Sequence, residues 1–273
     1  MQGFKFIFKR FNVQGNKILE ADLECISITE ILSAHICNLC NSQDLLDLSP
    51  PLQAFQAYAI HLYDLISDDH VYRRGEPTFL KLYGVDYVKK TEEIYKMMFM
   101  ELAKDLERRG IRNAMALAQE QYTQTINIDQ IRNSAVFPSK KAFRLQEEIA
   151  GIPASKMALL SRATPDIEKL IFHLANAMTT SDDLVDLFHG EDFSGTKTTI
   201  PISLLKEEFG QIAQDNRKLA RSAAIRRTKD YIWSQSVSAI KILRQYNSAK
   251  GGFLSRLMCE IFSFIDKFPE EYL

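Results

Sequence analysis

The spacing of apolar residues along the chain predicts helices. From Ile18 onward, apolar side chains recur at intervals of three and four residues, the period of a helix that buries one face. Strand-like alternation is scarce. It is found in the phenylalanines near the N-terminus, so a short strand or hairpin is expected within residues 1–17. The chain is therefore predicted to be all-α.

Glycine and proline mark the expected ends of these helices. Gly84 and Gly110 interrupt the apolar pattern, and four prolines fall at plausible boundaries: Pro138, Pro153, Pro165 and Pro201. No Pro-, Gly- or Ser-rich linker, shift of composition or internal repeat divides the sequence. We therefore predict one helical domain over residues 1–273, in which residues 1–17 form an N-terminal arm.

Composition narrows the classes of function. The 273 residues are 46% apolar and 25% charged, which suits a globular protein with a sizeable core. The formal net charge is −1, and without a basic field we expect no binding to nucleic acid. No stretch approaches the roughly 20 consecutive apolar residues of a membrane span, and no secretory leader is evident, so a cytoplasmic location is expected.

Two short features have a structural and a functional reading. Lys5, Lys9 and Arg10 stand among the N-terminal phenylalanines, so this arm either covers the edge of the core or makes a peripheral contact with a membrane. Cys37 and Cys40 form a CxxC pair, but no second ligand pair follows at zinc-site spacing. We interpret both cysteines as reduced, small apolar residues on a buried helix.

Residues 171–186 carry an acidic turn in a mostly apolar helical pattern. Asp182 and Asp186 are four residues apart and share one helix face, and Asp183 lies beside them. Carboxylates one turn apart repel each other and oppose helix formation unless a cation neutralises them. This pattern indicates a site for a divalent metal, although a solvated helix face also accounts for a single such turn.

Residues 60–69 repeat this arrangement. Asp64 and Asp68 are again four residues apart, and Asp69 follows immediately. Two acidic turns that face each other would form an oxygen-rich site suited to Mg²⁺, which keeps water or phosphate oxygens in its shell. Cationic and hydroxyl side chains follow both clusters, in residues 73–75 and 197–199, and they favour a phosphate or diphosphate ligand.

In their order and spacing, these residues resemble the trans-isoprenyl diphosphate synthases. The first region of that family reads approximately IHxxSLIHDDxxD and then RRGxPT, and here residues 60–78 read IHLYDLISDDHVYRRGEPT. The second region reads approximately FQxxDDxxD and then GKxTLP, and it is matched by MTTSDDLVD at 178–186 and KTTIP at 197–201. Between them, Lys156 occupies the place of the family's helix lysine.

The resemblance implies an antiparallel bundle of the isoprenoid synthase type, with an apolar pocket whose mouth binds three Mg²⁺ ions and a prenyl diphosphate. It implies catalytic roles for Asp68, Asp69, Asp182, Asp183 and Lys156. The implied substrate-binding residues are Arg73, Arg74, Lys156, Thr179, Lys197 and Tyr63. The implied metal ligands are Asp68, Asp182 and Asp186, to which we add Asp64.

Three departures from the family pattern change the expected activity. Tyr72 replaces the third aspartate of the first motif, and Asp64 is a substitute ligand one turn upstream of Asp68. Thr179 replaces the glutamine before the second motif. The N-terminal region lacks the family's GGKRxRP block, which contributes to the isopentenyl diphosphate site. Ordinary chain elongation is therefore not expected.

The expected activity is ionisation of an allylic prenyl diphosphate. In the family that the chain resembles, the residue five before the first aspartate helps to set the pocket depth, and Tyr63 holds that position here. The resemblance therefore implies a bulky pocket floor and a substrate of about ten to twenty carbons. The cation would then pass to a non-standard acceptor or be cyclised, as in prenyltransferases and terpene synthases. The alternative is a non-catalytic regulatory subunit. The resemblance also implies a homodimer, or a heteromer in the regulatory case.

Overall fold

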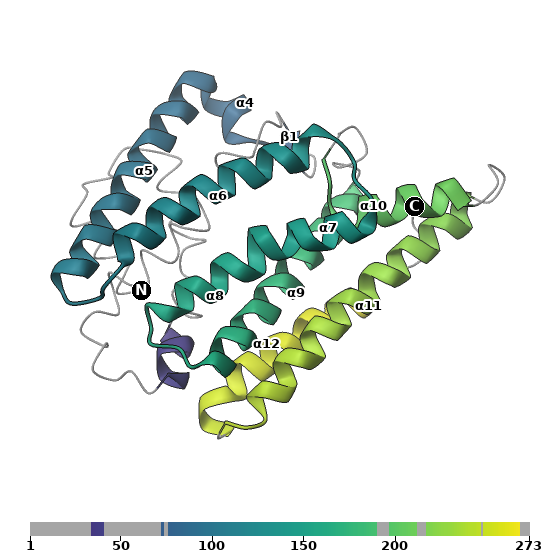
Figure 1. Ribbon diagram of the computed structural model, residues 1–273. Coiled ribbons are helices and arrows are strands. Elements are labelled where there is room, and N and C mark those ends of the chain that lie inside the picture. Colours follow the sequence, from purple (N-terminus) through teal and green to yellow (C-terminus); the bar gives the residue numbers. More distant parts are fainter. Residues whose placement is uncertain are drawn as a thin grey trace. The chain divides into compact units, whose positions relative to one another are not determined.

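The computed structural model describes residues 34–40, 72–73, 76–189, 197–211, 217–246 and 248–267. The described elements are almost all helices (Figure 1). Residues 34–39 are helical, and the elements that follow are β1 (Tyr72–Arg73), β2 (Glu76–Pro77), α4 (Phe79–Tyr83), α5 (Val85–Arg108), α6 (Ala114–Ser134), α7 (Ser139–Gln146), η2 (Glu147–Gly151), α8 (Ile152–Leu159), α9 (Pro165–His189), α10 (Ile200–Gln211), α11 (Arg217–Leu243) and α12 (Ser248–Asp266). The predicted all-α class is confirmed.

The two described strands form a minimal hairpin. Tyr72 pairs with Pro77 and Arg73 with Glu76, in antiparallel register. The sequence did not lead us to expect strands here, because two residues are too short for an alternating pattern to be recognised. The strand or hairpin predicted within residues 1–17 lies outside the described residues.

The chain divides into two compact units. The first comprises residues 1–126 and 156–164, and the second comprises residues 127–155 and 165–273. α6 and α8 therefore contribute residues to both units. The single domain expected from the sequence stays a prediction.

In the first unit, α5 supplies a buried apolar face. Met98, Leu102 and Leu106 are fully buried, at the helical spacing that the sequence pattern predicts. The helix ends just before Gly110, as predicted, and this glycine has a φ of +90°. There the amide of Ile111 donates to the carbonyl of Leu106 at 2.9 Å, the closing bond of a glycine-terminated helix.

The CxxC cysteines also belong to the first unit. Cys37 is buried in helix 34–39, and its thiol donates to the Ser161 hydroxyl at 3.6 Å. Burial raises the pKa of the Cys40 thiol to about 12, with a smaller contribution from Cys37. Both thiols therefore stay protonated at neutral pH, consistent with the structural role expected for them.

In the second unit, α9 is the central helix and packs against η2, α10, α11 and α12. Figure 1 shows α9 and α11 lying side by side and running in opposite directions. The buried apolar residues of α9 recur at three- and four-residue intervals: Ile167, Leu170, Ile171, Leu174, Ala177, Leu184 and Leu187. Pro165 is its first residue, as predicted.

α7, η2 and α8 follow one another without a break, as the continuous ribbon in Figure 1 shows. η2 is a π-helical turn, and Pro153 stands just after it, at the start of α8. Proline removes a backbone donor, and π turns commonly accommodate such interruptions inside a helix. No helix in the described part of the chain is both long and apolar enough to cross a membrane.

Candidate functional site

The second acidic turn lies near the C-terminal end of α9. Asp182 is exposed, Asp186 is 7% exposed, and the Asp183 side chain is 13% exposed. The predicted helix therefore forms, and it places the first and third aspartates one turn apart. Carboxylates one turn apart repel each other, so the turn favours a cation.

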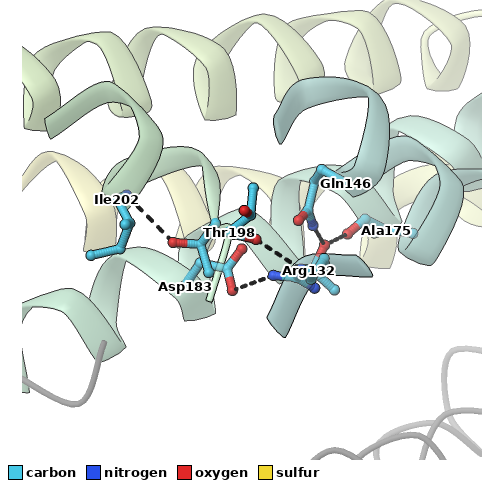
Figure 2. Close-up of polar contacts among 8 residues, drawn as sticks. Arg132, Gln146, Ala175, Asp183, Thr198 and Ile202 are labelled. Carbon is cyan, nitrogen blue, oxygen red and sulfur yellow. Dashed lines mark hydrogen bonds and ion pairs between the residues drawn. The ribbon is translucent and has the colours of Figure 1, made fainter. Parts of the chain in front are cut away.

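Arg132, at the end of α6, supplies a positive charge to this turn (Figure 2). Its Nη2 lies 3.4 Å from Asp183 Oδ1, and only 5% of its side chain is exposed. The same guanidinium donates from Nε to the Thr198 carbonyl at 2.9 Å. Arg132 thus connects the DDLVD turn to the segment that follows it in the family-like pattern.

The segment at 197–199 is held firmly by the second unit. The Thr198 amide donates to the Arg132 carbonyl at 2.7 Å, and its hydroxyl donates to the Ala135 carbonyl. Thr199 caps α10, because its hydroxyl accepts from the Ile202 amide at 3.4 Å (Figure 2). Lys197 begins this segment and is half-buried.

Thr179 is the residue that replaces the family's glutamine. Its hydroxyl donates to the Ala175 carbonyl at 2.7 Å and accepts a short hydrogen bond from Gln146 Nε2 (Figure 2). Gln146 is buried at the end of α7. An amide from another helix therefore stands beside the shorter Thr179 side chain.

Lys156 belongs to the first unit and forms an ion pair there. Its Nζ contacts Glu120 Oε1 on α6, and both side chains are partly exposed. The hydrogen bond from Lys156 holds the pKa of the Glu120 carboxyl below its usual value. The role of Lys156 in holding diphosphate stays a prediction.

The first predicted motif lies largely outside the part of the chain that the structure describes. Tyr63, Asp64, Asp68, Asp69 and Arg74 lie outside the described residues. Arg73 is described only through its backbone in β1. The roles predicted for these residues therefore stay predictions.

Among the described residues, no group of three or more His, Cys, Asp or Glu side chains is arranged to hold a metal ion. Asp183 is paired with Arg132, and Asp182 and Asp186 stay the predicted metal ligands of this turn. Two hard oxygen donors fit Mg²⁺, because this ion commonly uses one or two carboxylates and completes its shell with water and phosphate oxygens.

Arg132 and Gln146 were not anticipated from the sequence. Arg132 lies 51 positions from Asp183 and 66 from Thr198, so no local spacing pattern relates it to its partners. Gln146 is 33 positions from Thr179, so no local sequence pattern relates these two residues either. Only the packing of α6 and α7 brings these side chains to the acidic helix.

Solved structures share this fold. The chain is similar to a geranylgeranyl pyrophosphate synthetase from the archaeon Geoglobus acetivorans, with a TM-score of 0.71, 13% identity and coverage of 95% of this chain and 96% of that one. It is also similar to a decaprenyl diphosphate synthase from Rhodobacter capsulatus, with a TM-score of 0.69, 15% identity and coverage of 87% and 85%. For an octaprenyl pyrophosphate synthase from Helicobacter pylori, the TM-score is 0.60 and the identity 18%, with coverage of 84% of this chain and 87% of that one.

No protein-family model matches the sequence. No curated protein matches it either. The identities to the solved structures are low, so these likenesses establish the fold alone. The chain has the all-α fold of the trans-isoprenyl diphosphate synthases, as its two ordered motifs led us to expect.

Proposed function

We propose that this chain is a Mg²⁺-dependent enzyme that ionises an allylic prenyl diphosphate. The observation that carries the proposal is the meeting of two sequence blocks at Arg132, which contacts both Asp183 and the Thr198 carbonyl. The three solved structures reported above are prenyl diphosphate synthases, and this supports a prenyl diphosphate as the substrate. We expect a chain of about ten to twenty carbons.

In this proposal each residue near the α9 turn has a distinct task. Asp182 and Asp186 hold Mg²⁺, which supplies positive charge that stabilises the departing diphosphate. Lys197 adds a cation beside the leaving group. Lys156, which belongs to the first unit and pairs there with Glu120, is proposed as a further diphosphate ligand. Arg132 is a positioning residue, because it holds Asp183 and the 197–199 segment in place.

The reaction that consumes the prenyl cation distinguishes a prenyltransferase from a terpene synthase. The missing GGKRxRP block argues against isopentenyl diphosphate as the acceptor. The products proposed are therefore a prenyl group transferred to a non-standard acceptor or a cyclised terpene. A homodimer, or a heteromer with an active synthase, is the assembly we propose to test alongside activity.

The test is incubation of the purified full chain with geranyl, farnesyl or geranylgeranyl diphosphate and Mg²⁺, with diphosphate release as the measurement. We expect release that EDTA abolishes and that Asp182→Ala lowers by about 100-fold or more, the scale of lost electrostatic stabilisation. Asp166→Asn is the matched control, because Asp166 is an exposed aspartate in the first turn of the same helix. Equal losses in both variants would contradict the assignment.

A regulatory subunit is the second candidate. It is favoured by the finding that two predicted site residues, Asp183 and Lys156, are each ion-paired within the chain. Such a subunit would release no diphosphate from any of the three substrates. It would instead bind an active prenyl diphosphate synthase and change that enzyme's rate or product length, which co-purification and a mixed assay measure.

A further inference from the structure

A row of polar side chains continues from the acidic turn into the interior of the second unit. Asn176, Thr180 and Asp183 occupy positions i, i+4 and i+7 of α9 and therefore share one face. Asn176 and Thr180 are fully buried. The row is about 10 Å long, because seven residues of an α-helix rise about 1.5 Å each. The interior beside the proposed site is therefore polar along this face.

α7 and η2 lie against this face of α9. Gln146, the last residue of α7, reaches Thr179, and Gly151 at the end of η2 lies beside Asn176. A Cβ atom built on Gly151 would be 2.4 Å from Asn176 Nδ2 and 2.6 Å from Phe172 Cδ2. Glycine is therefore required at this approach, and the Asn176 amide is tightly confined on its η2 side.

Two members of the row, Asn176 and Thr180, have no hydrogen-bond partner for their side chains within the described part of the chain. This is true of both the nitrogen and the oxygen of the Asn176 amide and of the Thr180 hydroxyl. Buried polar groups in native proteins are nearly always hydrogen-bonded, because leaving them unsatisfied costs free energy. A wall that served only a hydrocarbon chain would favour apolar residues at these positions.

We propose that Asn176 and Thr180 hold a water molecule that captures the prenyl cation. The inference rests on the proposed ionisation and names its acceptor. The allylic carbon–oxygen bond breaks, and its electron pair leaves with the diphosphate. A lone pair of the water oxygen forms the new carbon–oxygen bond, and the water gives one proton to the released diphosphate. The products are a prenyl alcohol and inorganic diphosphate.

The size and chemistry of the row favour water over a larger acceptor. Gly151 and Phe172 leave the Asn176 amide little room on the side that they contact. The unsatisfied groups are the donor and the acceptor of the Asn176 amide and the Thr180 hydroxyl, which suit a ligand that both donates and accepts hydrogen bonds. A buried water typically makes about three such bonds.

The first test is product analysis in ¹⁸O-labelled water, with farnesyl diphosphate and Mg²⁺. We expect farnesol-type alcohol carrying one ¹⁸O, formed above the rate without protein. Asn176→Leu and Thr180→Val should each lower the ratio of alcohol to hydrocarbon products by about tenfold, equivalent to about 1.4 kcal/mol in the competing barriers. Thr91→Val is the matched control, because Thr91 is a buried threonine of α5 whose hydroxyl bonds to its own helix.

The outcomes separate this inference from the function on which it rests. Diphosphate release with unlabelled or purely hydrocarbon products would overturn the water site and leave the ionising enzyme standing. An unchanged product ratio in both α9 variants would do the same. No diphosphate release from any allylic substrate would overturn both proposals.

The second test examines the resting protein and does not depend on turnover. We expect a nuclear Overhauser transfer from a long-lived water to the side-chain amide protons of Asn176, which are identified by their loss in Asn176→Leu. Thr180→Val, which replaces the hydroxyl by a methyl group, should weaken this transfer. Absence of the transfer in the unaltered protein would overturn the water site.

Discussion

Arg132 and Asp183 form an ion pair of 3.4 Å between Nη2 and Oδ1, although 51 positions separate them in the sequence. Both side chains are largely removed from solvent, and Arg132 also donates to the Thr198 carbonyl. Burying either charged group without its partner would be strongly destabilising. The pair therefore makes the end of α6 a structural support of the acidic turn on α9.

Arg132→Met should destabilise the second unit by about 3 kcal/mol, because it leaves the Asp183 carboxylate buried without this cation. The measurement is urea unfolding followed by circular dichroism. Arg144→Met is the control, since Arg144 is largely exposed and its pair with Glu148 should contribute only about 0.5 kcal/mol. The double variant Arg132→Met/Asp183→Leu should recover most of the loss, and failure to recover it would argue against an electrostatic origin.

Lys156→Met and Glu120→Gln remove opposite members of one partly exposed pair. Each change should alter stability by less than about 1 kcal/mol, as is usual for surface ion pairs. Under the proposed function, only Lys156→Met should weaken the thermal stabilisation of the chain by Mg²⁺ and diphosphate. This comparison is made by differential scanning fluorimetry. Equal effects of the two variants would assign Lys156 a purely structural role.

Gly151→Ala should destabilise the protein by about 2 kcal/mol, because the added methyl group would overlap the Asn176 amide and the Phe172 ring. Gly210→Ala is the matched helical control. A Cβ at Gly210 meets no atom within 4 Å, and that variant should be between unchanged and about 1 kcal/mol more stable. Chemical denaturation of the two variants in parallel measures the difference.

Glu207→Gln should reveal a pH-dependent contribution to stability. Glu207 accepts from the Ser139 amide at 2.7 Å, at the start of α7, where no side chain from the N-cap residue caps the helix. This bond, with smaller help from Arg227, lowers the pKa of the Glu207 carboxyl in the folded state. The stabilisation is therefore complete above the unfolded pKa of about 4.3 and is lost as the pH falls through the folded pKa.

At pH 7 the Glu207→Gln variant should be about 1 kcal/mol less stable than the unaltered chain. The difference should shrink as the pH falls below about 4. Unfolding curves at a series of pH values measure it, and the exposed Glu93→Gln on α5 serves as the control. A difference that stayed constant with pH would exclude an ionised carboxylate as the cause.

The helical class and the acidic turn were predictable from the sequence because both depend on local spacing. The three- and four-residue apolar intervals of α5 and α9 reappear as buried faces, and Asp182 and Asp186 lie one turn apart as expected. The partners of that turn were not predictable. Arg132 and Gln146 reach α9 through the packing of distant helices, and nothing in their local sequence signals a charge or hydrogen bond across such separations.

The π turn of η2 complicates any residue-by-residue comparison of this chain. Hydrogen bonds in a π turn span five residues, whereas those of an α-helix span four. The side chains of α8 therefore point in the directions expected if one residue had been inserted after α7. If the chain were aligned without a gap to an uninterrupted helix, each residue of α8 would be matched to a position one residue away from its true structural equivalent. Equivalences across residues 147–151 should therefore be assigned from superposed backbones, since letter matching will be one position out of phase there.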